Sequence, residues 1–313
     1  MIAVLLLTPG AAHAAVTADD GAHVVQETII DDRTIDLEVW SPAVKRTLGV
    51  RLQLPASWAS EPARTYPVLY LLHGANEWVD YRSWTQFTDV ETFLADKPVL
   101  TVMPSAGSGG FFTKEWNFGR PGGQDYETFH TVELPQLIER GYRANGRRAI
   151  AGLSIGGYGA MAYAARHPGL YGSVASYSGL LHLRQGNTWM VVSTIRVRAH
   201  RSFVGLWGSP AAQAKIWRSV NPYDLAERLR GTPMFVSAGN GRAGPLDPKD
   251  DPNILGNPIE EWAWNNSRAF VAHLDALGIP VTADLYRGGT HTWPYWEREF
   301  QRSWPVLAEG LGL

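Results

Sequence analysis

A serine framed by two glycines is the most informative feature of this 313-residue sequence, in the segment Gly152-Leu153-Ser154-Ile155-Gly156. An apolar run precedes the segment and an alanine-rich, helix-like stretch follows it. In this context G-x-S-x-G places the serine on a sharp strand-to-helix turn, where the flanking glycines relieve crowding. The helix N-terminus also directs backbone N–H groups toward the site. Ser154 is therefore a candidate nucleophile, and an incidental serine in a glycine-rich turn is the structural alternative.

A serine nucleophile needs a general base, and in this architecture the chain order is serine, then acid, then histidine. The chain has nine histidines, of which His291 follows the strand-like stretch Val281–Tyr286. Small residues and aromatics frame it in the segment Gly-Gly-Thr-His-Thr-Trp. We expect His291 to be the base. The alternative is a loop histidine that packs on Trp293.

The acid is less clearly marked, because several carboxylates lie between Ser154 and His291. The candidates are Asp247, Asp250, Asp251, Glu260 and Glu261. The aspartates belong to a proline-broken segment typical of a solvated loop, and they lack the spaced ligands of a calcium site. The two glutamates begin a helix-like stretch, where the helix dipole also favours acidic residues. The residues alone do not choose between these candidates.

Buried parallel strands are predicted to carry these residues. Four nearly continuous apolar runs are typical of strands buried on both faces: Tyr66–Leu72, Pro98–Met103, Arg148–Gly152 and Pro233–Ala238. Helix-like stretches separate them: Glu133–Tyr142, Gly156–His167 and Ser267–Leu277. A β-rich entry precedes them, with strand-like stretches His23–Ile30, Ile35–Trp40 and Val50–Leu54. The alternation predicts an α/β fold with a mostly parallel sheet flanked by helices, and a site at the carboxyl ends of the strands.

Composition narrows the classes of partner. The net charge is −2, from 28 basic and 30 acidic residues, so a broad nucleic-acid-binding surface is not expected. Cysteine is absent, which excludes disulfides, thiolate metal sites and a cysteine nucleophile. The 13 tryptophans favour aromatic walls around a pocket as well as core packing.

The N-terminus resembles an export signal. An apolar run, Ile2–Leu7, leads to Ala12-His13-Ala14, an A-x-A cleavage pattern. We expect residues 1–14 to be a signal peptide and residues 15–313 to form a single domain, secreted from the cell. The alternative is an apolar N-terminal strand or helix. No other apolar stretch reaches the roughly 20 residues of a membrane span.

Several motifs together resemble the secreted esterase and antigen 85 mycolyltransferase group of α/β hydrolases, in the esterase D-like superfamily. The resemblance extends from about Leu37 to Trp296. Besides the serine segment, it rests on Tyr-Leu-Leu-His-Gly-Ala ending at Ala75, Asp80-Tyr81-Arg-Ser-Trp84, Thr128–Pro135, Ser178–Leu181, Leu206–Gly208, Asn221-Pro222, Gly239–Gly241 and Gly289–Trp293 with Tyr295-Trp296. It implies an α/β-hydrolase fold.

The resemblance also implies roles for particular residues. The family acid is a helical glutamate about 32 residues before the histidine, which selects Glu260, with Glu261 as the fallback. The oxyanion donors would be the N–H groups of Ala75 and Ile155. His73 would shape the loop beside the site.

The function implied is acyl transfer through an acyl-enzyme, with hydrolysis of an ester as the simplest outcome and no metal or organic cofactor. The mycolyltransferases carry an acidic residue at the position of His73 and a basic one at Asn76, both associated with sugar recognition, so transfer to trehalose is not expected. Acyl transfer to a sugar or other alcohol is the alternative activity. A non-catalytic binding protein on a hydrolase scaffold is a third.

The substrate is expected to be a small-molecule, lipid or carbohydrate ester, with an association with the cell envelope left open. Candidate substrate-binding residues are His73, Asn76, Tyr81, Trp84, Trp293 and Trp296, whose aromatic members could stack on a sugar. We expect residues 182–207 to supply an apolar wall for the acyl group. The alternative for that stretch is an amphipathic helix with a solvated basic face.

Overall fold

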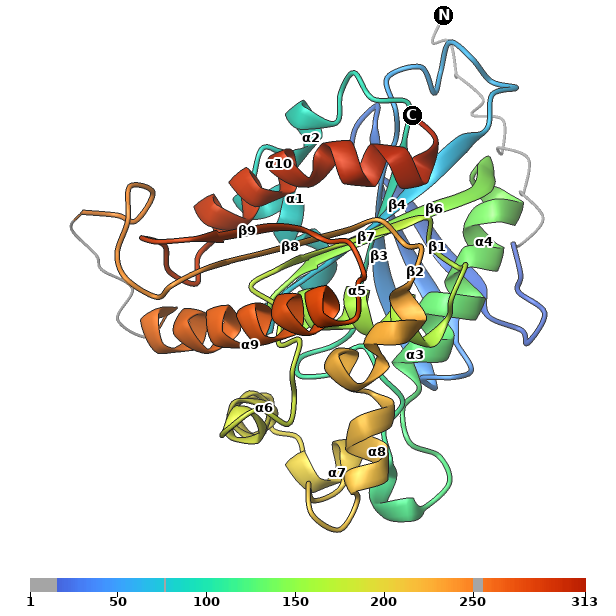
Figure 1. Cartoon of the computed structure of the whole chain (residues 1–313). Coiled ribbons are helices and arrows are strands. Elements are labelled where there is room, and N and C mark those ends of the chain that lie inside the picture. The colour runs from blue at the N-terminus through green and yellow to red at the C-terminus, as the bar shows by residue number, and fades with distance from the viewer. Residues whose placement is uncertain (1–15, 76, 250–255) are drawn as a thin grey trace, which may run out of the picture.

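The computed structural model describes residues 16–75, 77–249 and 256–313 (Figure 1). The predicted signal peptide therefore lies outside the described residues, as do Asn76, Asp250 and Asp251. Within the described residues the strands form one nine-stranded sheet, in the order β1-β2-β3-β5-β4-β6-β7-β8-β9. The strands are β1 (His23–Ile29), β2 (Thr34–Ser41), β3 (Arg46–Gln53), β4 (Tyr66–Leu72), β5 (Leu100–Pro104), β6 (Ala144–Leu153), β7 (Ser173–Tyr177), β8 (Met234–Gly239) and β9 (Thr282–Tyr286).

Strand direction divides the sheet into two parts. The strands β1, β2 and β3 pair antiparallel, and β3 pairs antiparallel with β5. From β5 to β9 every neighbouring pair is parallel. The carboxyl ends of β4, β6, β7, β8 and β9 therefore meet at one edge of the sheet, where ligands bind in open α/β sheets.

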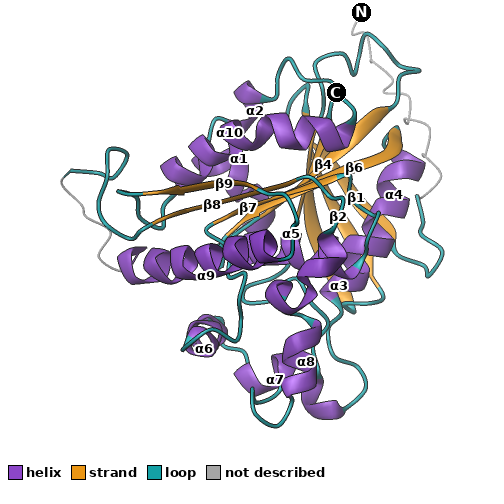
Figure 2. Cartoon of the chain, viewed as in Figure 1, coloured by secondary structure: helices purple, strands orange, loops and turns teal. Residues whose placement is uncertain are grey.

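Helices cover both faces of the parallel half, as Figure 2 shows in purple around the orange strands. α10 packs on β6 and β7 from one side, and α5 packs on the same strands from the other, beside α9 on β8. The helices are α1 (Ser83–Phe87), α2 (Val90–Phe93), α3 (Tyr126–Thr128), α4 (Leu134–Gly141), α5 (Ile155–Arg166), α6 (Thr188–Arg198), α7 (Phe203–Trp207), α8 (Ala214–Ser219), α9 (Gly256–Ala276) and α10 (Trp293–Leu311), with short turns η1 (Asp80–Arg82), η2 (Asn117–Gly119), η3 (Phe129–Glu133) and η4 (Pro222–Leu229).

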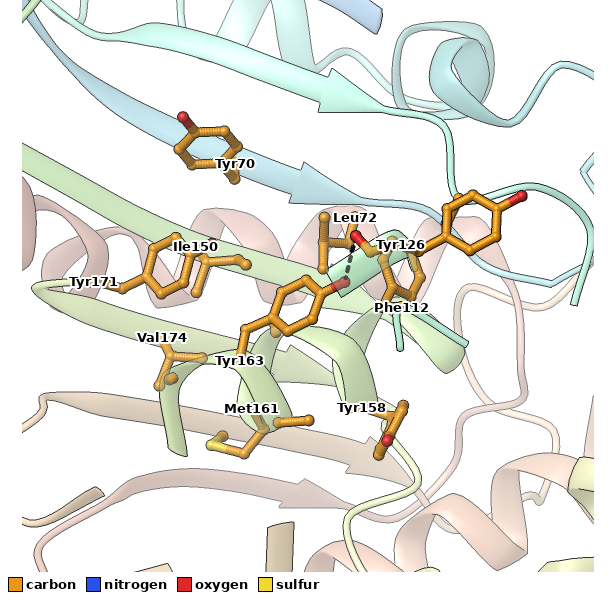
Figure 3. Packing of buried hydrophobic residues seen from close by; sticks show 14 of the residues in the cluster. Tyr70, Leu72, Phe112, Tyr126, Ile150, Tyr158, Met161, Tyr163, Tyr171 and Val174 are labelled. Carbon is orange, nitrogen blue, oxygen red and sulfur yellow. Dashed lines mark hydrogen bonds between the residues drawn. The ribbon is translucent and has the colours of Figure 1, made fainter. Parts of the chain in front are cut away.

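The central strands are buried on both faces because successive side chains enter different halves of the core. On β4, Tyr70 and Leu72 join the core under α5, whereas Leu69 and Leu71 join the core under α10. Figure 3 shows the first of these clusters, in which the Tyr163 hydroxyl of α5 donates to the Tyr126 carbonyl. A continuous apolar run is therefore what these positions require.

The predicted fold class is confirmed: the chain has an α/β-hydrolase fold with a mostly parallel sheet. Several elements differ from the expectation, among them the long helix α10, which was not predicted. Strand β7 was not predicted, because its sequence Ser-Val-Ala-Ser-Tyr is short and contains two serines that are fully buried in the structure. Helix α9 begins at Gly256, about one turn before the two glutamates that were expected to begin a helix-like stretch, and it is continuous with the stretch Ser267–Leu277.

Candidate active site

Ser154 stands on the turn between β6 and α5, in a backbone conformation that most residues avoid. Its φ is 53° and its ψ is −120°, which is the strained geometry of a nucleophile elbow. The flanking glycines make this turn feasible. A Cβ on Gly152 would lie 2.4 Å from the Gly156 carbonyl oxygen, and a Cβ on Gly156 would lie 2.4 Å from the His73 carbonyl oxygen. The N–H of Ser154 donates to the Tyr177 carbonyl, which fixes the turn against β7.

Ser154, His291 and Glu260 form a hydrogen-bonded chain. His291 Nε2 lies 3.0 Å from Ser154 Oγ, and His291 Nδ1 lies 2.7 Å from Glu260 Oε2. Because the carboxylate only accepts, Nδ1 carries a proton and donates it to Glu260, which leaves the lone pair of Nε2 facing the serine hydroxyl. The three side chains are nearly or fully shielded from solvent. This geometry is that of a nucleophile, a base and an orienting acid.

Glu260 is fully buried, and three donors satisfy its carboxylate. Oε1 accepts from the Ser178 hydroxyl at 2.8 Å and from the Gly239 N–H at 2.6 Å, while Oε2 receives the bond from His291. Ser178 in turn accepts a bond from the indole N–H of Trp296 at 3.0 Å. These bonds compensate the cost of burying a charge. Glu261, the other candidate on this helix, is exposed.

The loop that carries His291 is held by main-chain and carboxylate contacts. Asp247, another of the candidate acids, accepts from the hydroxyls of Thr290 and Tyr295 and from the Gly244 N–H. It therefore braces the histidine loop and does not contact His291. The imidazole packs edge-on against Trp296, with ring centroids 4.8 Å apart, rather than on Trp293 as the alternative reading of this loop expected.

The loop after β4 passes directly beside the serine. A Cβ on Gly74 would lie 3.9 Å from Ser154 Cβ, so the Gly74–Ala75 peptide runs beside Ser154. Ile155 is the first residue of α5, where backbone N–H groups have no partner within the helix. Ala75 and Ile155 thus lie on the two main-chain segments that flank Ser154.

The His73 side chain hydrogen-bonds to the Gly74–Ala75 peptide and so orients it. Its Nδ1 lies 2.6 Å from the Gly74 carbonyl oxygen, and its Nε2 lies 3.2 Å from Asp80 Oδ2. The Gly74 carbonyl belongs to the same planar peptide as the Ala75 N–H, so a bond to one fixes the direction of the other. Asp80 also accepts from the Ser105 hydroxyl and the Gly107 N–H.

Electrostatics favour a charged pair at this position. Burial opposes the charge on His73, but Asp80 and the Gly74 carbonyl outweigh it, so the pKa of His73 is raised above its ordinary value. Burial likewise opposes ionisation of Asp80, yet His73, Ser105 and Gly107 lower its pKa to about 2. A doubly protonated His73 uses one N–H for Gly74 and the other for Asp80. The N–H of Ala106 lies 3.0 Å from His73 Nε2 and 3.2 Å from Asp80 Oδ2, so it donates to Asp80 when Nε2 carries a proton and to Nε2 when it does not.

A cavity of about 340 Å³ opens onto Ser154 and His291. Its walls come from the loop after β4, from α6 and from the start of α9, and most of its lining side chains are apolar. The lining residues are Gly74, Ala75, Glu77, Leu153, Ser154, Val191, Thr194, Ile195, Arg198, Pro258, Ile259, Trp262, His291 and Trp296. Burial, partly offset by His73, raises the pKa of Glu77. Helix α6 lies within residues 182–207, the stretch expected to supply an apolar wall.

Several residues expected to bind substrate lie elsewhere in the structure. Trp84 is only 1% exposed, donates its indole N–H to the Leu72 carbonyl and packs under α10, so it cannot stack on a sugar ring. The Tyr81 ring covers Gly49 of β3, and Trp293 stacks on Phe87. His73 is buried below the loop. Of the expected aromatics, Trp296 lines the cavity.

Sequence reasoning did not assign roles to some residues that the structure places at the site. Ser178 and Asp80 belong to motifs used for the resemblance, but their contacts depend on strands distant in sequence. Glu77 and Arg198 line the cavity without belonging to any motif. For these two, the only sequence signal was their position in loops or helices that follow the strands.

The fold and this arrangement of serine, histidine and glutamate at the strand ends are those of an α/β hydrolase. Residues 41–306 match the model of the Esterase family, described as "Putative esterase". The chain belongs to this family. The predicted resemblance is thereby confirmed.

Named relatives support this placement. The chain is 30% identical over 274 residues to "Esterase Rv1288" of Mycobacterium tuberculosis, covering 83% of this chain and 57% of that protein. It thus spans little more than half the length of that relative. It is 29% identical over 289 residues to "Diacylglycerol acyltransferase/mycolyltransferase Ag85B" of Mycolicibacterium smegmatis, covering 88% of this chain and 85% of that protein. The solved structure of MPT51 (FbpC1) of M. tuberculosis is similar with a TM-score of 0.73 and 25% identity, covering 88% of this chain and 97% of that one.

Proposed function

We propose that the chain is a serine esterase that hydrolyses carboxylic esters through Ser154, His291 and Glu260. The observation that carries the proposal is the hydrogen-bonded chain from Ser154 Oγ through the imidazole to the buried carboxylate, at 3.0 and 2.7 Å, facing an apolar cavity. Family membership and the two named relatives support the same chemistry.

The reaction has two steps. In the first, Ser154 Oγ attacks the ester carbonyl while His291 Nε2 takes the hydroxyl proton, and the same proton is then given to the departing alcohol. In the second, a water loses its proton to His291 as it attacks the acyl-enzyme, and Ser154 regains a proton as the acid leaves. Glu260 keeps the imidazole in the required tautomer and stabilises the imidazolium that forms in both steps.

The N–H groups of Ala75 and Ile155 would form the oxyanion hole. Each such donor, aimed at the negative charge that develops on the carbonyl oxygen, contributes roughly 3–4 kcal/mol to lowering the barrier. The helix α5 adds its positive N-terminal end. The approach of Gly74 to Ser154 and the bond from His73 to the Gly74 carbonyl support this role for Ala75.

The size of the cavity suits a short or medium acyl group. A volume of about 340 Å³ holds roughly ten non-hydrogen atoms if each needs about the 30 Å³ that a water molecule occupies. Val191, Ile195 and Ile259 would contact the acyl chain. We therefore propose short-to-medium acyl esters as substrates.

The proposal is tested with Ser154→Ala and a fluorophosphonate probe. The probe should label Ser154 in the wild-type protein and should leave the variant unlabelled, and the variant should lose turnover of p-nitrophenyl esters while keeping its circular dichroism spectrum. Labelling at another residue, or full turnover by the variant, would show that the nucleophile is misassigned.

Acyl transfer to an alcohol is the second candidate, favoured by the similarity to Ag85B. Glu77 and Arg198 are polar groups in the cavity wall that could bind the hydroxyls of an acceptor. A transferase must hold its acceptor close and keep water out. Mass spectrometry of the products, with an acyl donor and an excess of trehalose, distinguishes the two. Free acid should dominate, and acyl-trehalose as the main product would favour the transferase.

We also propose that the protein is secreted. The support is the A-x-A pattern before Ala15 in the sequence. Within the described residues, none of the helices combines the length and apolar character needed to cross a bilayer. N-terminal sequencing of protein from culture supernatant should find Ala15 as the first residue. Retention of the intact N-terminus inside the cell would contradict export.

A further inference from the structure

Five large apolar side chains on or beside the elements that form the cavity walls are exposed to solvent. Trp78 is 99% exposed, Val197 66%, Met190 45%, Trp189 41% and Trp262 39%. We call these five residues the apolar rim. Single exposed apolar residues are common on proteins, but a group of this size around one opening marks an interaction surface.

Helix α6 presents apolar side chains in two directions. Val191 and Ile195 point into the cavity. Trp189, Met190 and Val197 are exposed on a neighbouring face of the same helix. Helical geometry separates the two groups, because positions 189, 190 and 197 fall within about 100° of one another around the axis. The outward face is therefore apolar and partly exposed to solvent.

The orientation of α6 is fixed by Arg196. This buried guanidinium forms an ion pair with Glu115 at 2.9 Å and donates to the carbonyl oxygens of Gly109 and Ser202. In Figure 1, α6 stands apart from the sheet, at the outer side of α9 and close to α7. The anchor holds the outward face of α6 toward solvent, so its exposure follows from how the helix is attached.

The rim continues on the other walls of the entrance. Trp78 follows Glu77, which lines the cavity, so it stands on the loop after β4. Trp262 lines the cavity from α9 and is still partly exposed. The Trp189 ring contacts Phe203, with centroids 6.2 Å apart, which extends the surface toward α7. Three different elements thus place a tryptophan beside one opening.

We infer that the apolar rim docks the protein onto a lipid surface that carries its ester substrate. The inference rests on the proposed esterase function. A body that covers the rim also covers the entrance to Ser154, so a protein partner seated there would block the site. A lipid surface can cover the rim productively, because the substrate enters the cavity from that surface.

The chemistry of the rim fits a lipid–water boundary. Tryptophan is favoured there because its ring is apolar and its indole N–H is polar. Helix α6 contains no carboxylate, and Arg198, at its end, is exposed beside the cavity. A cation at this point is attracted by anionic headgroups. We therefore expect tighter binding to vesicles that contain an anionic lipid.

Binding is measured on Ser154→Ala protein, so that no substrate is consumed. The protein is sedimented with vesicles of phosphatidylcholine, with and without phosphatidylglycerol. The parent should bind, more tightly to the anionic vesicles, and a variant with Trp78→Ser, Trp189→Ser and Val197→Ser should lose at least tenfold in affinity. A matched control carries Val25→Ser, Ile29→Ser and Ile30→Ser, three exposed apolar residues in or next to β1, the strand at the far edge of the sheet. The control should bind like the parent.

Turnover separates this inference from the function it rests on. In an active background, the rim variant should hydrolyse p-nitrophenyl acetate at the wild-type rate, but it should lose about tenfold in activity on an emulsified triglyceride. Equal vesicle binding by the parent and the rim variant, or no binding by either, would overturn the docking proposal. So would a dimer, seen by analytical ultracentrifugation, that the rim substitutions dissociate. If p-nitrophenyl acetate is not hydrolysed at all, the proposed esterase function fails instead.

Discussion

The Ser178 hydroxyl donates to Glu260 Oε1 at 2.8 Å and accepts the indole N–H of Trp296. Ser178 directly follows β7, Glu260 lies in α9, and Trp296 lies in α10. One hydroxyl therefore links the carboxylate to helices on both faces of the sheet. Because the carboxylate orients His291, this link fixes the position of the imidazole relative to Ser154.

Replacing the carboxylate by an amide tests the assigned acid. Glu260→Gln removes the negative charge and permits the wrong imidazole tautomer, so kcat should fall by roughly a thousandfold or more while KM changes little. Glu261→Gln is the matched control, because Glu261 is the exposed neighbour on the same helix. Steady-state kinetics on p-nitrophenyl butyrate measure both. If Glu261→Gln alone caused a large loss of kcat, the acid would be Glu261 and not Glu260.

His73 should act as a positioning residue for the oxyanion hole. His73→Phe keeps a buried ring but loses the bond to the Gly74 carbonyl, so kcat should fall roughly tenfold to a hundredfold with KM nearly unchanged. The control is His130→Phe, another buried histidine, whose bonds go to Ser105 and Tyr163. That variant should be less stable, because it loses both bonds, but its folded fraction should keep the wild-type kcat. An equal loss of kcat in both variants would indicate a general packing effect.

The acyl wall should set the preferred chain length. Ile195 lines the cavity from α6, so Ile195→Trp should fill it and lower kcat/KM for octanoyl esters by at least tenfold relative to acetyl esters. Val197→Trp, two residues further along the same helix, faces solvent and should leave the chain-length profile unchanged. A series of p-nitrophenyl esters from acetate to dodecanoate gives both profiles. If Ile195→Trp kept the wild-type chain-length preference, the acyl chain would not bind against Ile195.

The His73–Asp80 pair should make stability depend on pH in two directions. The lowered pKa of Asp80, about 2, means that its contribution is present above the unfolded pKa near 4 and is lost as pH falls toward 2. The raised pKa of His73 means that its contribution is present below about pH 6.5 and is lost as pH rises past the folded value. Asp80→Asn should therefore lower the free energy of unfolding most between about pH 4 and 6.5. Urea unfolding of the variant and of the wild-type protein across this pH range measures the difference in stability. A constant difference at every pH would exclude the charged pair.

The sequence predicted the fold because the central strands are buried on both faces, and a run such as Tyr66–Leu72 shows this directly. Other elements were not predicted, because polar residues in them are buried. The serines of β7 are fully buried, and a strand of five residues that includes two serines gives no apolar run. The antiparallel strands β1 and β2 were expected close to their observed bounds, whereas β3 begins at Arg46, four residues before the expected Val50. Only its second half shows the alternation of apolar and polar residues that is typical of one-sided burial.

The candidate site was predicted where motif and position coincide. Ser154 and His291 stand in distinctive glycine-rich segments, and the structure brings them within hydrogen-bonding distance. The substrate-binding aromatics were less predictable, because a tryptophan in a motif can serve packing as well as recognition. Trp84 packs in the core, whereas Trp262, which no motif marked, lines the cavity. Such differences depend on tertiary contacts that spacing does not encode.

The contact of Gly156 with the end of β4 has a consequence for how this protein can diversify. A Cβ on Gly156 would lie 2.4 and 2.6 Å from the carbonyl oxygens of His73 and Leu72, so the main chain at Gly156 directly contacts the main chain at the end of β4. The separation between the nucleophile turn and the Gly74 loop is therefore independent of any side-chain rotamer. The cavity walls, in contrast, include many side chains, among them those on α6 and α9. New substrate preferences can evolve through those walls while the reaction centre stays unaltered.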